Sequence, residues 1–125
     1  MKKWVFLIAI LSASNVYAGT FDVGKNAVLK VYDGDSVNIR MRLAHIDTPE
    51  IKGQCAAEVT LAKQARDFTQ GFMKANPKYS ITVLGVGRYG RPLVEIRAGT
   101  KYLNQLLVDR GLARAYEGKR RSWCN

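Results

Sequence analysis

The sequence predicts a single small α+β domain that is mainly β, with one long and one short helix. Short runs rich in β-forming residue types occupy residues 26–47, 79–85 and 92–98. Between the first two runs, apolar residues recur at three- or four-residue spacing, which is typical of one face of an amphipathic helix. The chain of 125 residues is long enough for one domain with a modest core.

The first strand-like region is interrupted by the turn Asp33-Gly34-Asp35. The long helix is expected from about residue 56 to residue 74. It ends at Asn76-Pro77, because a proline disfavours helical backbone in the residue before it. The apolar face of this helix consists of Ala57, Leu61, Ala65, Phe68 and Phe72.

The second half of the chain predicts two further strands, a short helix and a last short strand. A glycine-rich, basic loop at residues 85–91 separates the strands at 79–85 and 92–98. Leu103, Leu106 and Leu107 mark the short helix, and Gly111 suits a left-handed cap at its end. Residues 113–116 are expected to add a last short strand. This order favours a five-stranded Greek-key barrel of the OB type with helices packed on it, and an open α+β sandwich is the alternative.

The first 18 residues predict a secretory signal peptide. Lys2 and Lys3 precede an apolar run at residues 4–11, and the segment ends on Val16-Tyr17-Ala18, which favours cleavage after Ala18. The alternative is an N-terminal membrane anchor, but the run is shorter than the roughly 20 residues that a spanning helix needs. We therefore expect a periplasmic or secreted monomer, with one domain at residues 19–125 and no membrane contact after cleavage.

The chain is strongly basic, with 20 lysines and arginines against 10 acidic residues. Without Lys2 and Lys3 the net charge is +8. Such an excess favours polyanionic partners, since each neutralised phosphate releases condensed counterions. Charge alone would equally serve membranes, heparin-like polymers or solubility, so it does not select among these partners.

Two cysteines, Cys55 and Cys124, follow the predicted cleavage point. In an oxidising compartment such a pair favours a disulfide. Its loop of about 70 residues implies roughly 4 kcal/mol of stabilisation from chain entropy. Two unrelated thiols are the alternative, and the chain's single histidine does not complete a zinc site.

Several polar residues at strand ends suit metal and phosphate chemistry. Asp35 and Asp47 each follow a predicted strand, and Pro49 leaves the carbonyl of Thr48 available as a ligand. Such hard oxygen donors suit Ca²⁺ or Mg²⁺. Glu50 lies just past the same turn, within reach of a water near a metal.

Two arginines, Arg42 and Arg91, offer planar donors that match phosphate oxygens. A metal, a carboxylate and two arginines form a set that suits phosphodiester hydrolysis. Each residue also has a plainer interpretation as a turn residue, a solvated arginine or part of a basic hairpin tip. Strict strand alternation would put Arg42 and Asp47 on opposite faces, so a shared site requires a bulge or bend between them.

Four motifs in this order resemble the thermonuclease (staphylococcal nuclease) family. They are Val-Tyr-Asp-Gly-Asp-Ser at 31–36, Arg-Leu-Ala-His-Ile-Asp-Thr-Pro-Glu at 42–50, Arg-Tyr-Gly-Arg at 88–91, and Asn-Gln-Leu-Leu-Val-Asp-Arg-Gly-Leu-Ala at 104–113. The resemblance covers about residues 26–116 and implies an OB barrel.

The resemblance also implies a calcium-dependent nuclease. Water would attack phosphorus in DNA or RNA and leave 3′-phosphate ends. The implied Ca²⁺ ligands are Asp35, Asp47 and the Thr48 carbonyl; the implied catalytic residues are Glu50 as general base with Arg42 and Arg91 on the phosphate. Arg88, Tyr89 and Tyr116 would contact the nucleotide.

Two departures from the family pattern concern the site. Asp35 and Arg42 are only seven residues apart, whereas the best-known member has a longer hairpin, and a third helix of that member has no counterpart after Tyr116. The rival interpretation is a non-catalytic, basic OB-fold module that binds nucleic acid. Such modules are expected to lose metal or base residues. Here all of these residues are retained, which favours the enzyme.

Overall fold

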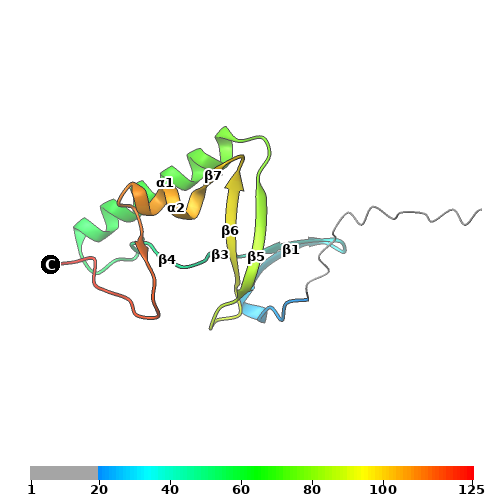
Figure 1. Cartoon of the computed structure of the whole chain (residues 1–125). Helices are drawn as coiled ribbons and strands as arrows, with labels where there is room; N and C mark the ends of the chain where they lie inside the picture. Colours follow the sequence, from blue (N-terminus) through cyan, green and yellow to red (C-terminus); the bar gives the residue numbers. More distant parts are fainter. Residues whose placement is uncertain (1–19) are drawn as a thin grey trace, which may run out of the picture.

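A computed structural model describes residues 20–125 of the chain (Figure 1). The predicted signal peptide lies outside these residues and stays a prediction. Over residues 20–125, none of the helices has the length and apolar character needed to cross a membrane.

The two predicted helices are confirmed. α1 spans Ala56–Ala75, and the Asn76 side chain that follows it donates to the Phe72 carbonyl at 2.7 Å. α2 spans Leu103–Asp109, and Gly111 just beyond it has a φ of 70°. That left-handed conformation costs glycine little, which explains why the helix ends there. A short 3-10 helix, η1, spans Lys25–Ala27.

The strands are arranged around β6, which pairs antiparallel with β5 and β7 and parallel with β3. Two other pairs are separate from this sheet: the antiparallel hairpin β1–β2 and the antiparallel pair β4–β8. The strands are β1 Val28–Asp33, β2 Ser36–Ile39, β3 Arg42–Leu43, β4 Ile46–Asp47, β5 Ser80–Val86, β6 Pro92–Ala98, β7 Lys101–Tyr102 and β8 Arg114–Ala115.

The α+β class is confirmed, but the strand count differs from the predicted five. Eight strands form three sheets, and the strands of residues 20–125 do not close into a barrel. The region 26–47, which the turn at Asp33-Gly34-Asp35 was expected to divide into two strands, forms four, and β7 is a further strand that was not expected. His45 has a φ of 62°, a left-handed conformation through which a strand does not continue.

The core lies between the two helices and one face of the sheet (Figure 1). Alternation along β6 buries Val94, Ile96 and Ala98 on the helix side. Leu103 and Leu107 of α2 are almost fully buried, while Ala57, expected on the inner face of α1, is exposed. The buried cluster consists of Ile46, Ala65, Phe72, Val94, Ile96, Ala98, Leu103, Leu107, Leu112 and Ala113.

The buried side chain of Asn104 joins α2 to two other parts of the fold. Its Nδ2 donates to the carbonyls of Ala44 and Val94, both at 3.1 Å, and its Oδ1 accepts from the Ile96 N–H at 3.2 Å. A buried amide with these partners has its polar groups satisfied. Asn104 therefore fixes the turn between β3 and β4 against β6.

The β1–β2 hairpin lies outside this core. Every residue of both strands is exposed, including Val31 and Tyr32, and the hairpin extends away from the helices in Figure 1. The turn at its tip carries Asp35.

Candidate functional site

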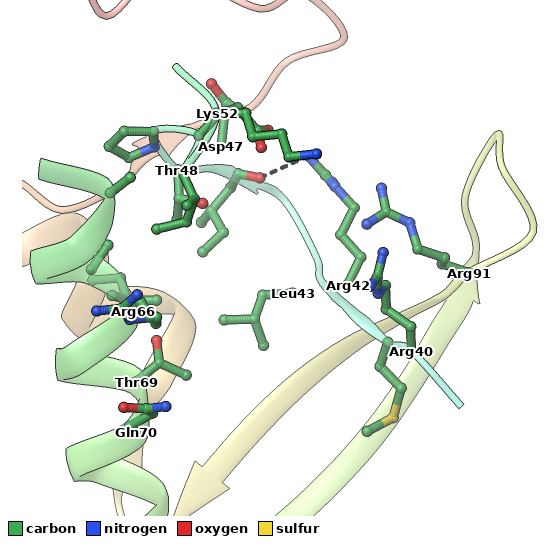
Figure 2. A pocket seen from close by; sticks show the side chains of 18 residues that line it. Arg40, Arg42, Leu43, Asp47, Thr48, Lys52, Arg66, Thr69, Gln70 and Arg91 are labelled. Carbon is green, nitrogen blue, oxygen red and sulfur yellow. Dashed lines mark hydrogen bonds between the residues drawn. The ribbon is translucent and has the colours of Figure 1, made fainter. Parts of the chain in front are cut away.

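An open pocket of about 780 Å³ lies between α1 and the chain from Arg40 to Lys52. Figure 2 shows its lining side chains. The pocket brings together five of the residues expected at the site: Arg42, Asp47, Thr48, Glu50 and Arg91.

The bend that a shared site requires lies at His45, between Arg42 and Asp47. After this bend, one Arg42 terminal nitrogen donates back to the Ile46 carbonyl at 3.1 Å, the dashed line in Figure 2. The Arg42 guanidinium also lies 5.2 Å from the centre of the Tyr116 ring. Tyr116 thus contacts Arg42 without itself lining the pocket.

Arg91 enters the pocket from the loop between β5 and β6. Its carbonyl accepts from the Gly87 N–H at 2.9 Å. Gly90 has a φ of 78°, and a Cβ there would lie 2.5 Å from the Gly24 Cα, so this close approach requires glycine. Arg88 and Tyr89 are exposed on the loop and do not line the pocket.

The pocket has an excess of positive charge. Five basic side chains line it against two acidic ones, Asp47 and Glu50. Arg40, Arg42 and Arg91 lie close to one another on the side of the pocket opposite α1 (Figure 2). Such a cluster favours polyanions. The basic residues that the sequence did not single out are Arg40, Lys52 and Arg66, and only the overall charge pointed to them.

The carboxylate of Asp47 is buried and both of its oxygens have partners. Oδ1 lies 3.2 Å from Nε of Arg120, and Oδ2 accepts from the indole N–H of Trp123 at 3.1 Å. The same Arg120 lies 3.0 Å from Oε1 of Glu50. Arg120 therefore bridges the two acidic residues of the pocket.

The disulfide between Cys55 and Cys124 is present, as expected. It attaches the C-terminal segment, residues 117–125, to the residue that precedes α1, and Figure 1 shows the C-terminus beside that end of the helix. Trp123 is the immediate neighbour of Cys124. The covalent link therefore holds Trp123 and Arg120 near Asp47.

Glu58 holds the loop that carries Glu50 through two hydrogen bonds. It is buried, and its two oxygens accept from the backbone N–H groups of Glu50, at 3.3 Å, and Gln54, at 2.8 Å. A glutamate at the third position of a helix commonly accepts from the N–H of the residue that precedes the helix, which is a signal that the sequence did contain. Glu58 reaches further back, to Gln54 and Glu50.

Asp35 is not brought to the pocket. It lies in the turn of the β1–β2 hairpin, where its Oδ1 accepts from the Ser36 hydroxyl at 3.4 Å. The pKa of the neighbouring Asp33 is lowered, first by its side-chain hydrogen bond with Asp35 and then by that with Ser36. Of the two aspartates expected as metal ligands, Asp47 lines the pocket and Asp35 does not.

The donors in the pocket suit a hard cation. Asp47 and Glu50 offer carboxylates and Thr48 a carbonyl, the ligand types that Ca²⁺ prefers. The bridging position of Arg120 indicates that positive charge is stable between the two carboxylates. Within residues 20–125, the one compact group of three metal-ligand side chains is Cys55, Glu58 and Cys124, and its two sulfurs are joined to each other.

Comparison with known proteins gives two matches. Residues 40–124 match the profile of the family described as staphylococcal nuclease homologue. A thermonuclease from Staphylococcus hyicus is 31% identical over 97 residues, which is 70% of this chain and 57% of that protein. The chain therefore spans little more than half the length of this curated relative.

Removal of the disulfide should destabilise the protein. Its ends are 69 residues apart, so in the chain-entropy model its loss lowers the free energy of unfolding by roughly 4 kcal/mol. Urea unfolding of the oxidised wild type and of a variant with Cys55→Ser and Cys124→Ser measures this difference. Reductant should destabilise the wild type equally and leave the variant unchanged; equal stability of oxidised and reduced wild type would contradict the prediction.

Proposed function

The chain belongs to the staphylococcal nuclease homologue family, and from this premise we propose that it is a calcium-dependent nuclease that hydrolyses DNA and RNA. Family membership supports a nuclease. The observation that carries the proposal is that one open, basic pocket is lined by two arginines and two carboxylates: Arg42, Arg91, Asp47 and Glu50.

Arg42 and Arg91 are the proposed phosphate ligands. Their guanidinium groups match the non-bridging oxygens of a phosphodiester, and they stabilise the negative charge that grows on these oxygens in the transition state. The hydrogen bond from Arg42 to the Ile46 carbonyl and its contact with Tyr116 limit the freedom of this side chain. Less ordering is then required when substrate binds.

Glu50 is the proposed general base. Its side chain is 57% exposed, so water has access to it, while Glu58 holds its backbone N–H. Glu50 would accept a proton as a water oxygen bonds to phosphorus and the bond to O5′ breaks. The products are a 3′-phosphate and a 5′-hydroxyl, whose oxygen takes a proton from solvent.

Asp47 and the Thr48 carbonyl are the proposed Ca²⁺ ligands, with Asp35 as a further ligand. The ion would supply Lewis-acid stabilisation of the phosphate charge. The role of Asp35 requires the β1–β2 hairpin to approach the pocket. The hydrophobic effect would favour such a movement, because it would bury apolar side chains such as Val31 and Val37 that are now exposed.

Arg88, Tyr89 and Tyr116 are the proposed nucleotide contacts. Arg88 and Tyr89 are exposed beside Arg91, and Tyr116 lies against Arg42. Aromatic rings stack on bases of any sequence, so they suit a nuclease with little sequence preference. We further propose a periplasmic or secreted monomer; the disulfide supports an oxidising compartment.

A non-catalytic module that binds nucleic acid is the second candidate. One observation favours it: Arg120 forms ion pairs with both Asp47 and Glu50. These are the carboxylates that a nuclease would need to bind the metal and to activate the attacking water. In that case the pocket would bind phosphates without cleaving them. The two variants below distinguish these functions.

Glu50→Gln should slow cleavage of DNA by roughly 10² to 10⁴-fold, because glutamine cannot accept the proton from water. Rates at saturating substrate and calcium measure this loss. Glu117→Gln, an exposed carboxylate outside the pocket, is the control and should cleave normally. A normal rate in Glu50→Gln would remove Glu50 as the base.

Arg91→Ala should raise the barrier to cleavage by about 3 kcal/mol, through loss of charge stabilisation in the transition state. The matched control is Arg97→Ala, which removes the same charge outside the pocket. If Arg91→Ala weakens DNA binding more than Arg97→Ala does, and the wild type cleaves nothing with calcium or other divalent ions, the binding module is the correct function.

A further inference from the structure

The C-terminal segment contributes a contact to the pocket that the proposed chemistry above does not use. The indole N–H of Trp123 donates to Oδ2 of Asp47 at 3.1 Å, across 76 positions of sequence. Asp47 is buried, so its carboxylate has little water with which to exchange this bond. The contact therefore restricts the rotation of the carboxylate.

Trp123 is itself held on two sides. The adjacent Cys124 is bonded to Cys55. The guanidinium of Arg114 lies 3.7 Å from the centre of the Trp123 ring, and Arg114 is the strand partner of Asp47 in the β4–β8 pair. A nitrogen of Arg114 also donates to the Ser122 carbonyl at 2.9 Å. The indole is thus fixed relative to the strand that carries Asp47.

We propose that Trp123 is a positioning residue that orients the Asp47 carboxylate for a divalent cation, held in place by the Cys55–Cys124 disulfide. This inference rests on the proposed function. Carboxylates that bind metals are commonly hydrogen-bonded on their other oxygen, which fixes the direction of the ligating one. With Oδ2 held by Trp123, Oδ1 would be the oxygen available to a cation, and it is the oxygen that Arg120 contacts now.

The test measures calcium binding in the full, oxidised chain. The sequence has two tryptophans, Trp4 and Trp123, so Trp4→Phe leaves Trp123 as the only indole. In that chain, calcium should change the fluorescence of Trp123. Calorimetry then compares this chain with one that also carries Trp123→Phe, which keeps an aromatic ring but removes the N–H donor.

Trp123→Phe should weaken calcium binding by roughly 10- to 100-fold, which is the usual effect of losing a residue that hydrogen-bonds a metal ligand. Saturating calcium should largely restore kcat, which a general loss of structure would not allow. The control is Tyr79→Phe, which removes a hydroxyl group from an exposed aromatic residue outside the pocket and should bind calcium normally.

When Trp123→Phe folds, two results overturn the proposal, and they are distinguishable. Unchanged calcium affinity in Trp123→Phe, in a chain that cleaves DNA with calcium, refutes the role of Trp123 and leaves the nuclease intact. Absence of both calcium binding and cleavage in the Trp4→Phe chain and in the wild type refutes the nuclease and this inference together. If Trp123→Phe fails to fold, the fluorescence response decides: calcium binding with no change in Trp123 emission overturns the proposal.

Discussion

The Cys55–Cys124 disulfide is the constraint on which the arrangement of the pocket depends. Residues 117–125 form no helix or strand, so the backbone hydrogen bonds of regular structure do not hold them. The covalent link brings this segment to the start of α1, where Trp123 and Arg120 contact Asp47. A small domain with a modest core gains from such a link, because it restricts the unfolded chain.

The rest of the pocket is placed by three local features of the backbone. The left-handed His45 turns the chain so that Arg42 and Asp47 line the same pocket. Asn104 fixes this turn against β6 through the Ala44 carbonyl. Gly90 allows the loop before β6 to pass against Gly24 and to direct Arg91 inward. The site is therefore built mainly on turns, and the packed helices and β6 provide their support.

The regular elements were predictable because their patterns are long. The spacing of apolar residues in α1 and the alternation in β6 each extend over enough residues to identify the element. The expected ends of the helices, at Asn76-Pro77 for α1 and at Gly111 for α2, also agree with the structure. The division of residues 26–47 into four strands was not predictable, because it depends on the conformation of single residues such as His45.

The candidate site was predictable in part. The motifs identified Arg42, Asp47, Thr48, Glu50 and Arg91, which the fold brings together, and Asp35, which it leaves on the hairpin. The motifs did not identify Arg120 or Trp123. Their contacts with Asp47 join positions more than 70 residues apart through a disulfide, and no local pattern encodes such a contact.

The central claim is that Asp47, Glu50, Arg42 and Arg91 form one metal-dependent phosphodiesterase site. The most direct measurement is a crystal structure of the oxidised protein with calcium and a short oligonucleotide that carries a non-cleavable phosphorothioate. The account predicts calcium bonded to the Asp47 carboxylate and the Thr48 carbonyl, with the adjacent phosphate on Arg42 and Arg91. A phosphate bound elsewhere, with Asp47 still paired only to Arg120 and Trp123, would contradict it.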